Sequence, residues 1–247
     1  MDAVVGVVLA AGSGSRLRPL TSVRPKPMCP VGNVPLIDLA LERVSAAVDE
    51  VTVNLHHGGD VIDAHLPPGV HRSWELAEPL GTAGALGHLR GWIDGRGALV
   101  VNADAWCPGS LAGFTADWDG ERIRLLLAGD DDLRPASRVA GALLPWLDVA
   151  ELAAEPSGLY EASWRPARAA GRVEVLRHDG PFADCGTPAQ YLAANLAASG
   201  GESVVEPGAV VDGALDRCVM WRDAVVEATE SLSQAIRLGE RTTVLVR

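Results

Sequence analysis

The residues best suited to chemistry lie in a turn after the first predicted strand, where Gly12 and Gly14 occur. Glycines there let backbone N–H groups approach an anion, and a following helix N-terminus favours negative charge.

The next residues supply four cations within eleven positions: Arg16, Arg18, Arg24 and Lys26. Four prolines stiffen this loop: Pro19, Pro25, Pro27 and Pro30. A rigid cationic loop binds a polyphosphate at little entropic cost. A tight structural turn and a solvated basic loop are the alternatives.

Lys26 is the only lysine in the sequence, beside 20 arginines. An ammonium is a compact point charge, whereas a guanidinium is a planar fork, so this position is a candidate for a role that requires the smaller group. Chance survival of one lysine is the alternative. No Walker A sequence is present, and the third glycine of a dinucleotide fingerprint would fall at Leu17.

The elements that must position these residues alternate along the chain. Apolar runs predict buried strands at 4–9, 51–55, 98–101, 123–128, 139–144 and 173–176. Helical periodicity predicts helices from Pro35 to 48, at 60–66, 81–92 and from Thr187 to about 199, the last with Thr187 as its N-cap. This alternation predicts an α/β fold with a doubly wound, Rossmann-like mixed sheet. Ligands bind such sheets at the carboxyl ends of strands, where Gly12 and Asp104 lie.

The chain after Gly200-Gly201 has a different pattern. Aliphatic side chains recur there at a spacing of six residues: Met220, Val226, Leu232, Leu238 and Val244. This period predicts a short C-terminal left-handed β-helix-like tail, and ordinary edge strands are the alternative. We therefore expect a catalytic domain at 1–200 and a hexapeptide-like β tail at 201–247. A short coil stack leaves open edges, so the tail is a candidate surface for forming a homo-oligomer.

Composition excludes several classes of protein. The chain has 247 residues, a net charge of −11 and 48% hydrophobic residues, which is ordinary for a globular protein and opposite in sign to a non-specific nucleic-acid binder. No apolar run is long enough to span a bilayer, and the start carries an acid where a signal peptide needs a base, so we expect a cytoplasmic protein. The four cysteines form no CxxC pair, and we expect reduced thiols.

Residues 9–28 resemble, along their whole length, the signature of the sugar-1-phosphate nucleotidyltransferases. Three further blocks fit in order: 53–57 resembles the family's second strand, 78–86 its nucleoside-binding loop and 182–188 its late metal-binding segment. The resemblance implies transfer of a nucleoside monophosphate from a nucleoside triphosphate to a sugar-1-phosphate, with release of pyrophosphate and formation of a nucleotide sugar.

The resemblance also implies roles for individual residues. Arg16 would clamp the leaving phosphates, and Lys26 would place a point charge on the α-phosphate. Asp104 and Asp184 would bind Mg²⁺, which prefers carboxylate and phosphate oxygens, and Asp104 would thereby join Arg16 and Lys26 as a catalytic residue. Gly141 would face the sugar. Nucleotide binding would involve Leu9, Ala10, Ala11, Gly12, Gly14, Arg16, Lys26, Glu78, Gly81 and Thr82.

The sequence departs from the family pattern in mid-chain. Members commonly carry Glu-Lys-Pro there, whereas this chain has no second lysine, and Arg134 or Arg138 is the candidate substitute. Two alternatives to a sugar nucleotidyltransferase therefore stay open. One is a non-catalytic, nucleotide-sugar-binding regulatory subunit. The other is the same chemistry on a non-sugar phosphate such as phosphocholine or a cyclitol phosphate.

The polar residues just before the Gly-Thr-Ala-Gly stretch at 81–84 bear on the choice of base. They are Glu75 and Glu78, and a carboxylate only accepts hydrogen bonds. Guanine presents two adjacent donors, which favours GTP, with dTTP or UTP next. In the alternative, either glutamate caps the loop or faces solvent.

Overall fold

The computed structural model describes residues 3–246 of the chain. Asp2, on which the signal-peptide argument rests, lies outside the described residues. Within them, no helix combines the length and apolarity needed to cross a membrane. Contacts divide the chain into two compact units. Unit 1 comprises the chain up to Gly12, Ile37–Ala103 and Cys107–Phe182, and unit 2 comprises Ser13–Leu36, Asp104–Trp106 and the chain from Ala183 onward. The predicted division at residues 200 and 201 stays a prediction.

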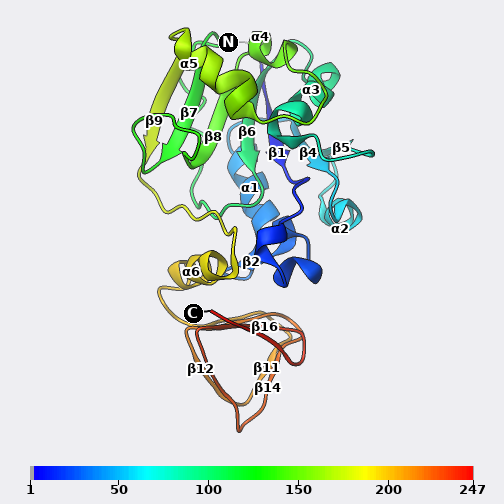
Figure 1. Ribbon diagram of the computed structural model, residues 1–247, viewed down its shortest axis with the longest axis vertical. Coiled ribbons are helices and arrows are strands. Elements are labelled where there is room, and N and C mark those ends of the chain that lie inside the picture. The colour runs from blue at the N-terminus through cyan, green and yellow to red at the C-terminus, as the bar shows by residue number, and fades with distance from the viewer. Residues whose placement is uncertain (1–2, 247) are drawn as a thin grey trace. The chain divides into compact units, whose positions relative to one another are not determined.

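Unit 1 is built on a seven-stranded sheet with the strand order β5-β4-β1-β6-β8-β7-β9 (Figure 1). All neighbouring strands are parallel except β8, which runs antiparallel to both β6 and β7, so the sheet is mixed. The strands are β1 (Val4–Leu9), β4 (Val51–Leu55), β5 (His71–Trp74), β6 (Gly97–Asn102), β7 (Ile123–Ala128), β8 (Val139–Leu144) and β9 (Val173–His178).

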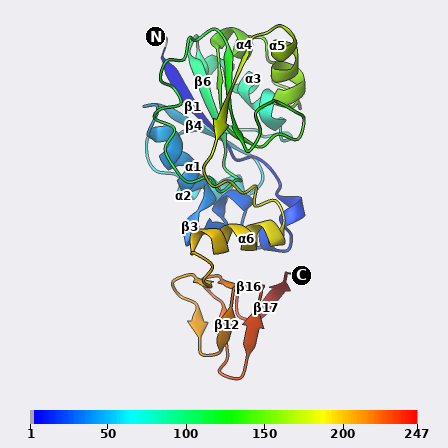
Figure 2. The same cartoon turned by 90° about the vertical axis from the view of Figure 1, so that its left-hand side faces the viewer.

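Helices cover both faces of this sheet, as a doubly wound fold requires, with α1 on one side of the strands and α3 and α5 on the other (Figure 2). The helices are α1 (Leu36–Ser45), α2 (Gly59–His65), α3 (Gly81–Ile93), α4 (Trp146–Ala150) and α5 (Arg165–Ala169), the last preceded by a π-helical turn at Tyr160–Trp164. The α1 face packs closely: a Cβ on Gly6 of β1 would lie 2.2 Å from Val44 Cγ1. The opposite face is the main hydrophobic core, which α3, α4 and α5 share with strands β1, β6, β7 and β8.

The predicted elements of unit 1 agree with the structure to within a few residues, and β7 and β8 have the predicted bounds. Pro35 is a small correction, because it ends β3 and the helix begins at Leu36. The strand β5 was not predicted, because its residues His71–Trp74 are mostly polar and show no apolar run. The helices α4 and α5 were not predicted either, because five residues are too few to show helical periodicity.

Unit 2 begins with the cationic loop, which is folded into short 3-10 turns at Ser15–Leu17, Leu20–Ser22 and Lys26–Met28. A β-hairpin with a two-residue loop follows, formed by β2 (Pro30–Val31) and β3 (Val34–Pro35). Its turn residues Gly32 and Asn33 both have positive φ, as a type I′ hairpin requires. Later in the chain α6 (Pro188–Ala198) starts at the predicted N-cap, where the Thr187 side chain accepts a hydrogen bond from the Gln190 N–H.

The C-terminal part of unit 2 is a β-helix-like tail of triangular outline (Figure 1). Successive coils pair in parallel on three sides: β10 with β13 and β13 with β16 on the first, β11 with β14 on the second, and β12 with β15 on the third. Its strands are β10 (Val204–Val205), β11 (Val210–Val211), β12 (Ala214–Asp216), β13 (Val219–Met220), β14 (Val225–Val226), β15 (Ser231–Ser233), β16 (Ala235–Leu238) and β17 (Thr242–Leu245).

The six-residue pattern holds for only part of the tail. Met220 and Val226 are fully buried in its core, and Leu232 packs against that core. Val244 was wrongly included in the pattern, because it lies in β17, which runs antiparallel to β16. The chain reverses after Leu238, so β17 closes one edge of the coil stack instead of starting another coil.

Candidate active site

The Gly14 turn anchors the cationic loop. Gly14 has a φ of +59°, and a Cβ there would lie 2.9 Å from Thr21 Cγ2 and 3.0 Å from Lys26 Cβ, so only glycine fits without strain. The Thr21 hydroxyl donates to the Gly14 carbonyl at 3.0 Å. Leu17 and Leu20 are fully buried beneath the loop. The loop is therefore held in one conformation by its own packing, as its prolines suggested.

Lys26 is buried, with 6% of its surface exposed, and its ammonium lies among acceptors. Nζ donates to Asp104 Oδ2 at 2.8 Å and to the Asp184 carbonyl at 2.9 Å. The Asp104 side chain is half exposed and the Asp184 residue is exposed. The one lysine of the chain thus binds the carboxylate of one predicted metal ligand and the backbone carbonyl of the other.

Two segments far apart in sequence bring these aspartates to the same lysine. Trp106 and Ala183 form an antiparallel bridge, with hydrogen bonds of 2.7 and 2.8 Å in both directions. Asp104 and Asp184 flank this bridge. The bridge therefore brings Asp104 and Asp184 together within unit 2, and no local pattern in the sequence could specify this pairing.

A small polar cavity of about 180 Å³ lies beside Lys26. Gly186 forms part of its wall, and a Cβ on Gly186 would approach the exposed guanidinium of Arg16. The lining residues are Ser13, Gly14, Ser15, Arg16, Lys26, Asp104 and Gly186. It combines backbone groups of the glycine turn, two cations and one carboxylate, which is the donor set of a phosphate and metal site.

Asp104 and Asp184 stay the predicted magnesium ligands. Within residues 3–246, no group of three or more His, Cys, Asp or Glu side chains is placed to hold a metal. Mg²⁺ seldom needs such a cage, because it usually takes one or two carboxylates and completes its shell with phosphates and water. The half-exposed Asp104 and the exposed Asp184 match that requirement.

The cysteines near this site are inert thiols. All four cysteines are free and buried. Burial raises the pKa of Cys29 and the pKa of Cys185 to about 12 each, against the smaller opposing effect of nearby cations and hydrogen bonds. Both side chains therefore stay protonated and act as small apolar groups, as expected from the sequence.

Unit 1 contains the remaining predicted nucleotide-binding residues, at the ends of two parallel strands. Asn54, at the end of β4 and 3% exposed, accepts from the Ala10 N–H at 2.6 Å through Oδ1. Its Nδ2 donates to Glu75 Oε1 at 2.7 Å, and Glu75 Oε2 accepts from the Leu80 N–H at 2.7 Å. We call this series of three hydrogen bonds the Asn54–Glu75 strut. It links the end of β1 to the predicted nucleoside loop.

The strut decides between the two expectations for Glu75. Only 2% of the residue is exposed and both carboxylate oxygens accept hydrogen bonds from the chain, so Glu75 holds the loop instead of facing a base. Glu78 is exposed. The sequence argument for guanine therefore rests on Glu78 alone. Asn54 was not among the predicted residues, although a lone amide in the apolar run 51–55 was a usable signal.

The glycines of the nucleoside loop have a packing role. Gly81, Gly84 and Gly87 lie on one stripe of α3, and a Cβ on any of them would come within 2.5 Å of a backbone carbonyl of the 153–157 segment. The Thr82 hydroxyl accepts from the Leu159 N–H at 2.8 Å. The loop is thus clamped between the strut and this segment.

The other predicted residues of unit 1 lie apart from the strut. A side chain on Gly141 of β8 would point toward Leu111 and Phe114, and its assignment to the sugar stays a prediction. Arg138 donates to the Ala128 carbonyl at 3.1 Å and stacks over Phe182. Arg134 is exposed.

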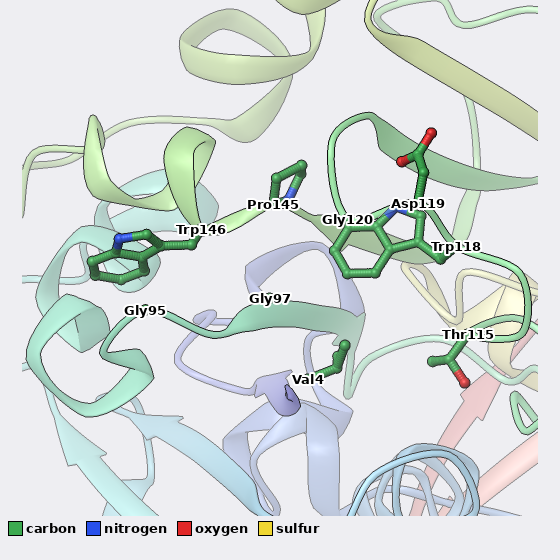
Figure 3. Close-up of a pocket in the computed structure, with 9 residues that line it drawn as sticks. All are labelled: Val4, Gly95, Gly97, Thr115, Trp118, Asp119, Gly120, Pro145 and Trp146. Atoms are coloured by element: carbon green, nitrogen blue, oxygen red, sulfur yellow. The ribbon is translucent and has the colours of Figure 1, made fainter. Parts of the chain in front are cut away.

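Another cavity, of about 70 Å³, lies in unit 1 and is lined by none of the predicted residues (Figure 3). Trp118 and Trp146 face it from opposite sides, and Val4 and Gly97 line it at the starts of β1 and β6. It therefore lies at the amino ends of these parallel strands. Leu9–Gly12 and the strut follow their carboxyl ends, where ligands bind in such sheets.

Comparison with known proteins identifies the family. The family described as "Nucleotidyl transferase" matches residues 5–119. The chain is 30% identical over 229 residues to the N-acetylmuramate alpha-1-phosphate uridylyltransferase of Caulobacter vibrioides, a match that covers 77% of this chain and 95% of the relative. It is 33% identical over 115 residues to the mannose-1-phosphate guanylyltransferase of Mycobacterium tuberculosis, covering 44% of this chain and 32% of that protein.

A solved structure shares the fold. The UDP-glucose pyrophosphorylase from Acinetobacter baumanii superposes with a TM-score of 0.65 at 18% identity, over 80% of this chain and 93% of that one. The match of the Caulobacter vibrioides relative extends over nearly its whole length, and the family signature lies on the Gly14 turn and Lys26. The chain belongs to the nucleotidyl transferase family, as a member of its sugar-1-phosphate nucleotidyltransferases.

Proposed function

We propose that Lys26 is the residue on which transfer of the nucleoside monophosphate to the sugar-1-phosphate depends. The observation that supports this role is its buried ammonium, which is bound to Asp104 and the Asp184 carbonyl beside the Gly14 cavity. The sugar phosphate is itself the nucleophile, so the protein needs no covalent residue and contributes positioning and charge stabilisation. A preorganised ammonium stabilises the charge that shifts at the α-phosphate.

Arg16 and the Gly14 turn bind the leaving pyrophosphate in this proposal. Arg16 is exposed at the rim of the cavity, where its planar fork can bind two phosphate oxygens at once. Backbone N–H groups of the turn add donors without a side-chain entropy cost. Asp104 and Asp184 would hold Mg²⁺, which would neutralise phosphate charge and orient the triphosphate.

The base is the finer question, and the relatives favour uracil. The relative matched over 95% of its length is a uridylyltransferase, whereas the guanylyltransferase is matched over only 32% of its length. We therefore propose UTP as the nucleotide, in place of the GTP that the sequence favoured, with a sugar-1-phosphate of the amino-sugar class as its partner. GTP is the second candidate, because the exposed carboxylate of Glu78 lies at the start of the nucleoside loop and can accept hydrogen bonds from two adjacent donors.

A matrix of five nucleoside triphosphates against sugar-1-phosphates, phosphocholine and a cyclitol phosphate tests the proposal, with pyrophosphate release as the readout. We expect the largest kcat/KM for UTP with a 2-acetamido sugar-1-phosphate. A preference for GTP that disappears in Glu78→Gln would instead support the second candidate. Nucleotide-sugar binding with no turnover for any pair would support the non-catalytic alternative and overturn the proposal.

A further inference from the structure

The β-helix-like tail contacts the cationic loop at Arg24, within unit 2. Arg24 Nη1 donates to Glu206 Oε1 at 3.0 Å, and its Nη2 lies 3.0 Å from Oε2, so the two groups form a two-bond fork. Glu206 follows β10 and is only 9% exposed. The Arg222 N–H donates to its Oε2 at 2.8 Å. This carboxylate is fixed by the tail and directed at the loop.

An aromatic contact strengthens the same junction. The Arg24 guanidinium lies 4.6 Å from the centre of the Trp221 ring, and Trp221 is 1% exposed. Trp221 Nε1 donates to the Tyr191 hydroxyl at 3.0 Å, and that hydroxyl donates in turn to the Pro30 carbonyl. The tail and α6 thus hold both ends of the 24–30 segment, which carries Lys26.

A shift of Arg24 should also move Lys26, because the two residues are close in a stiff segment of the chain. Pro25 separates the two residues and fixes its own φ, and the Met28 N–H donates to the Pro25 carbonyl at 2.8 Å. Lys26 is buried between Gly14 on one side and Asp104 on the other. A rigid segment held at both ends transmits a shift instead of absorbing it.

We infer that Arg24 is a positioning residue and not a phosphate ligand, and that Glu206 and Trp221 of the tail set the position of Lys26. The sequence had grouped Arg24 with the phosphate-binding cations, but its guanidinium is used by Glu206 and Trp221. The tail is then part of the catalytic unit. This inference rests on the role proposed for Lys26, and the experiment separates the two.

The test is a set of variants of the full chain assayed by pyrophosphate release, with thermal unfolding of each variant measured in parallel. Glu206→Gln should lower kcat by roughly 10- to 100-fold, the effect of a misplacement of about 1 Å, while KM for the triphosphate changes by less than about threefold. Glu206→Asp should restore part of kcat. Glu227→Gln is the matched control, since Glu227 pairs with the exposed Arg241 in the same tail and contacts no loop residue in the described structure.

Two cycles make the outcome decisive. In a Lys26→Ala background, Glu206→Gln should have no further effect on kcat, because the group it positions is gone. Arg24→Met with Glu206→Met should retain more activity than Glu206→Gln, because no buried charge is left unpaired. If Arg24 binds phosphate instead, Arg24→Met raises KM for the triphosphate and Glu206→Gln does not lower kcat, which would overturn the inference.

Different variants test the role proposed for Lys26 and the positioning role inferred for Glu206 and Trp221. Near-normal turnover in Lys26→Ala defeats the proposed function, and with it the inference. A large loss in Lys26→Ala with normal kcat in Glu206→Gln defeats the inference alone. Where Glu206→Gln lowers the unfolding temperature too far to assay, Trp221→Phe replaces it. This variant keeps the ring over Arg24 and removes the hydrogen bond to Tyr191, so a fall in kcat at unchanged KM supports the inference and an unchanged kcat overturns it.

Discussion

The two units hold their candidate ligand-binding residues by different means. In unit 1 the Asn54–Glu75 strut joins strand ends through amide, carboxylate and backbone groups, with no cation among its hydrogen-bond partners in the described chain. In unit 2 two cations, Lys26 and Arg24, are each paired with a carboxylate, Asp104 and Glu206. The difference suits their proposed ligands, because a neutral base needs shape and hydrogen bonds, whereas phosphates need fixed positive charge.

The comparison also shows how far each arrangement reaches along the chain. The strut links the ends of β1 and β4 to the loop after β5, and these three strands are parallel neighbours in one sheet. The charged site joins residues near 26, 104, 184 and 206, which share no sheet. Loss of a charge in unit 2 should therefore change the chemical step, and loss of a strut bond in unit 1 should change nucleotide affinity and stability.

The largest effect is expected for Lys26→Ala. Removal of one preorganised transition-state donor should lower kcat at least about 10²-fold. Lys26→Arg should also be impaired, because the longer planar fork cannot occupy the space between Gly14 and Asp104. Steady-state pyrophosphate release measures both variants. Turnover close to that of the unmodified protein in Lys26→Ala would remove the distinction between the two units.

The aspartates come next, and they should differ from each other. Asp104→Asn removes the ion pair with Lys26 as well as a metal ligand, whereas Asp184→Asn keeps the carbonyl that binds Lys26. Both should raise the Mg²⁺ concentration needed for half-maximal rate, with the larger fall in kcat in Asp104→Asn. A Mg²⁺ titration of each variant is the measurement. Full activity of the unmodified protein in EDTA would contradict the assignment of a metal to this pair.

The smallest effect is expected in unit 1, for Glu75→Gln. Both carboxylate oxygens accept from N–H donors, one from Asn54 Nδ2 and the other from the Leu80 N–H. The glutamine side chain has one oxygen and one NH₂ group, so one of these two donors would face the NH₂ group and lose its acceptor. An unsatisfied buried group costs about 1–3 kcal/mol of unfolding free energy. Denaturant unfolding should show this loss, and KM for the triphosphate should rise more than kcat falls.

Glu78→Gln is the control for that prediction, because Glu78 begins the same loop and is exposed. Its unfolding free energy should change by less than about 0.5 kcal/mol, as is usual for surface substitutions. Equal losses of stability in the two variants would show that the strut does not support the loop.

Features that depend on neighbours along the chain were predictable. Apolar runs predicted the bounds of β7 and β8, and the Thr187 cap was confirmed by the hydrogen bond from Gln190. The signature around Gly14 and Lys26 led to the family, and the six-residue spacing led to a β-helix-like tail. These features follow from backbone hydrogen bonding and the alternation of buried and exposed side chains, both of which leave a mark within a few residues.

Tertiary structure alone decided which charges pair and which polar groups are buried. The sequence grouped Arg24 with the phosphate-binding cations, yet Glu206, 182 positions later, binds its guanidinium. The same is true of Glu75, whose carboxylate was a candidate for binding the base in the sequence and is a buried link in the fold. A charged side chain satisfies its hydrogen bonds with whichever partner the chain brings within about 3 Å. That choice depends on the path of the whole backbone, which local patterns do not encode.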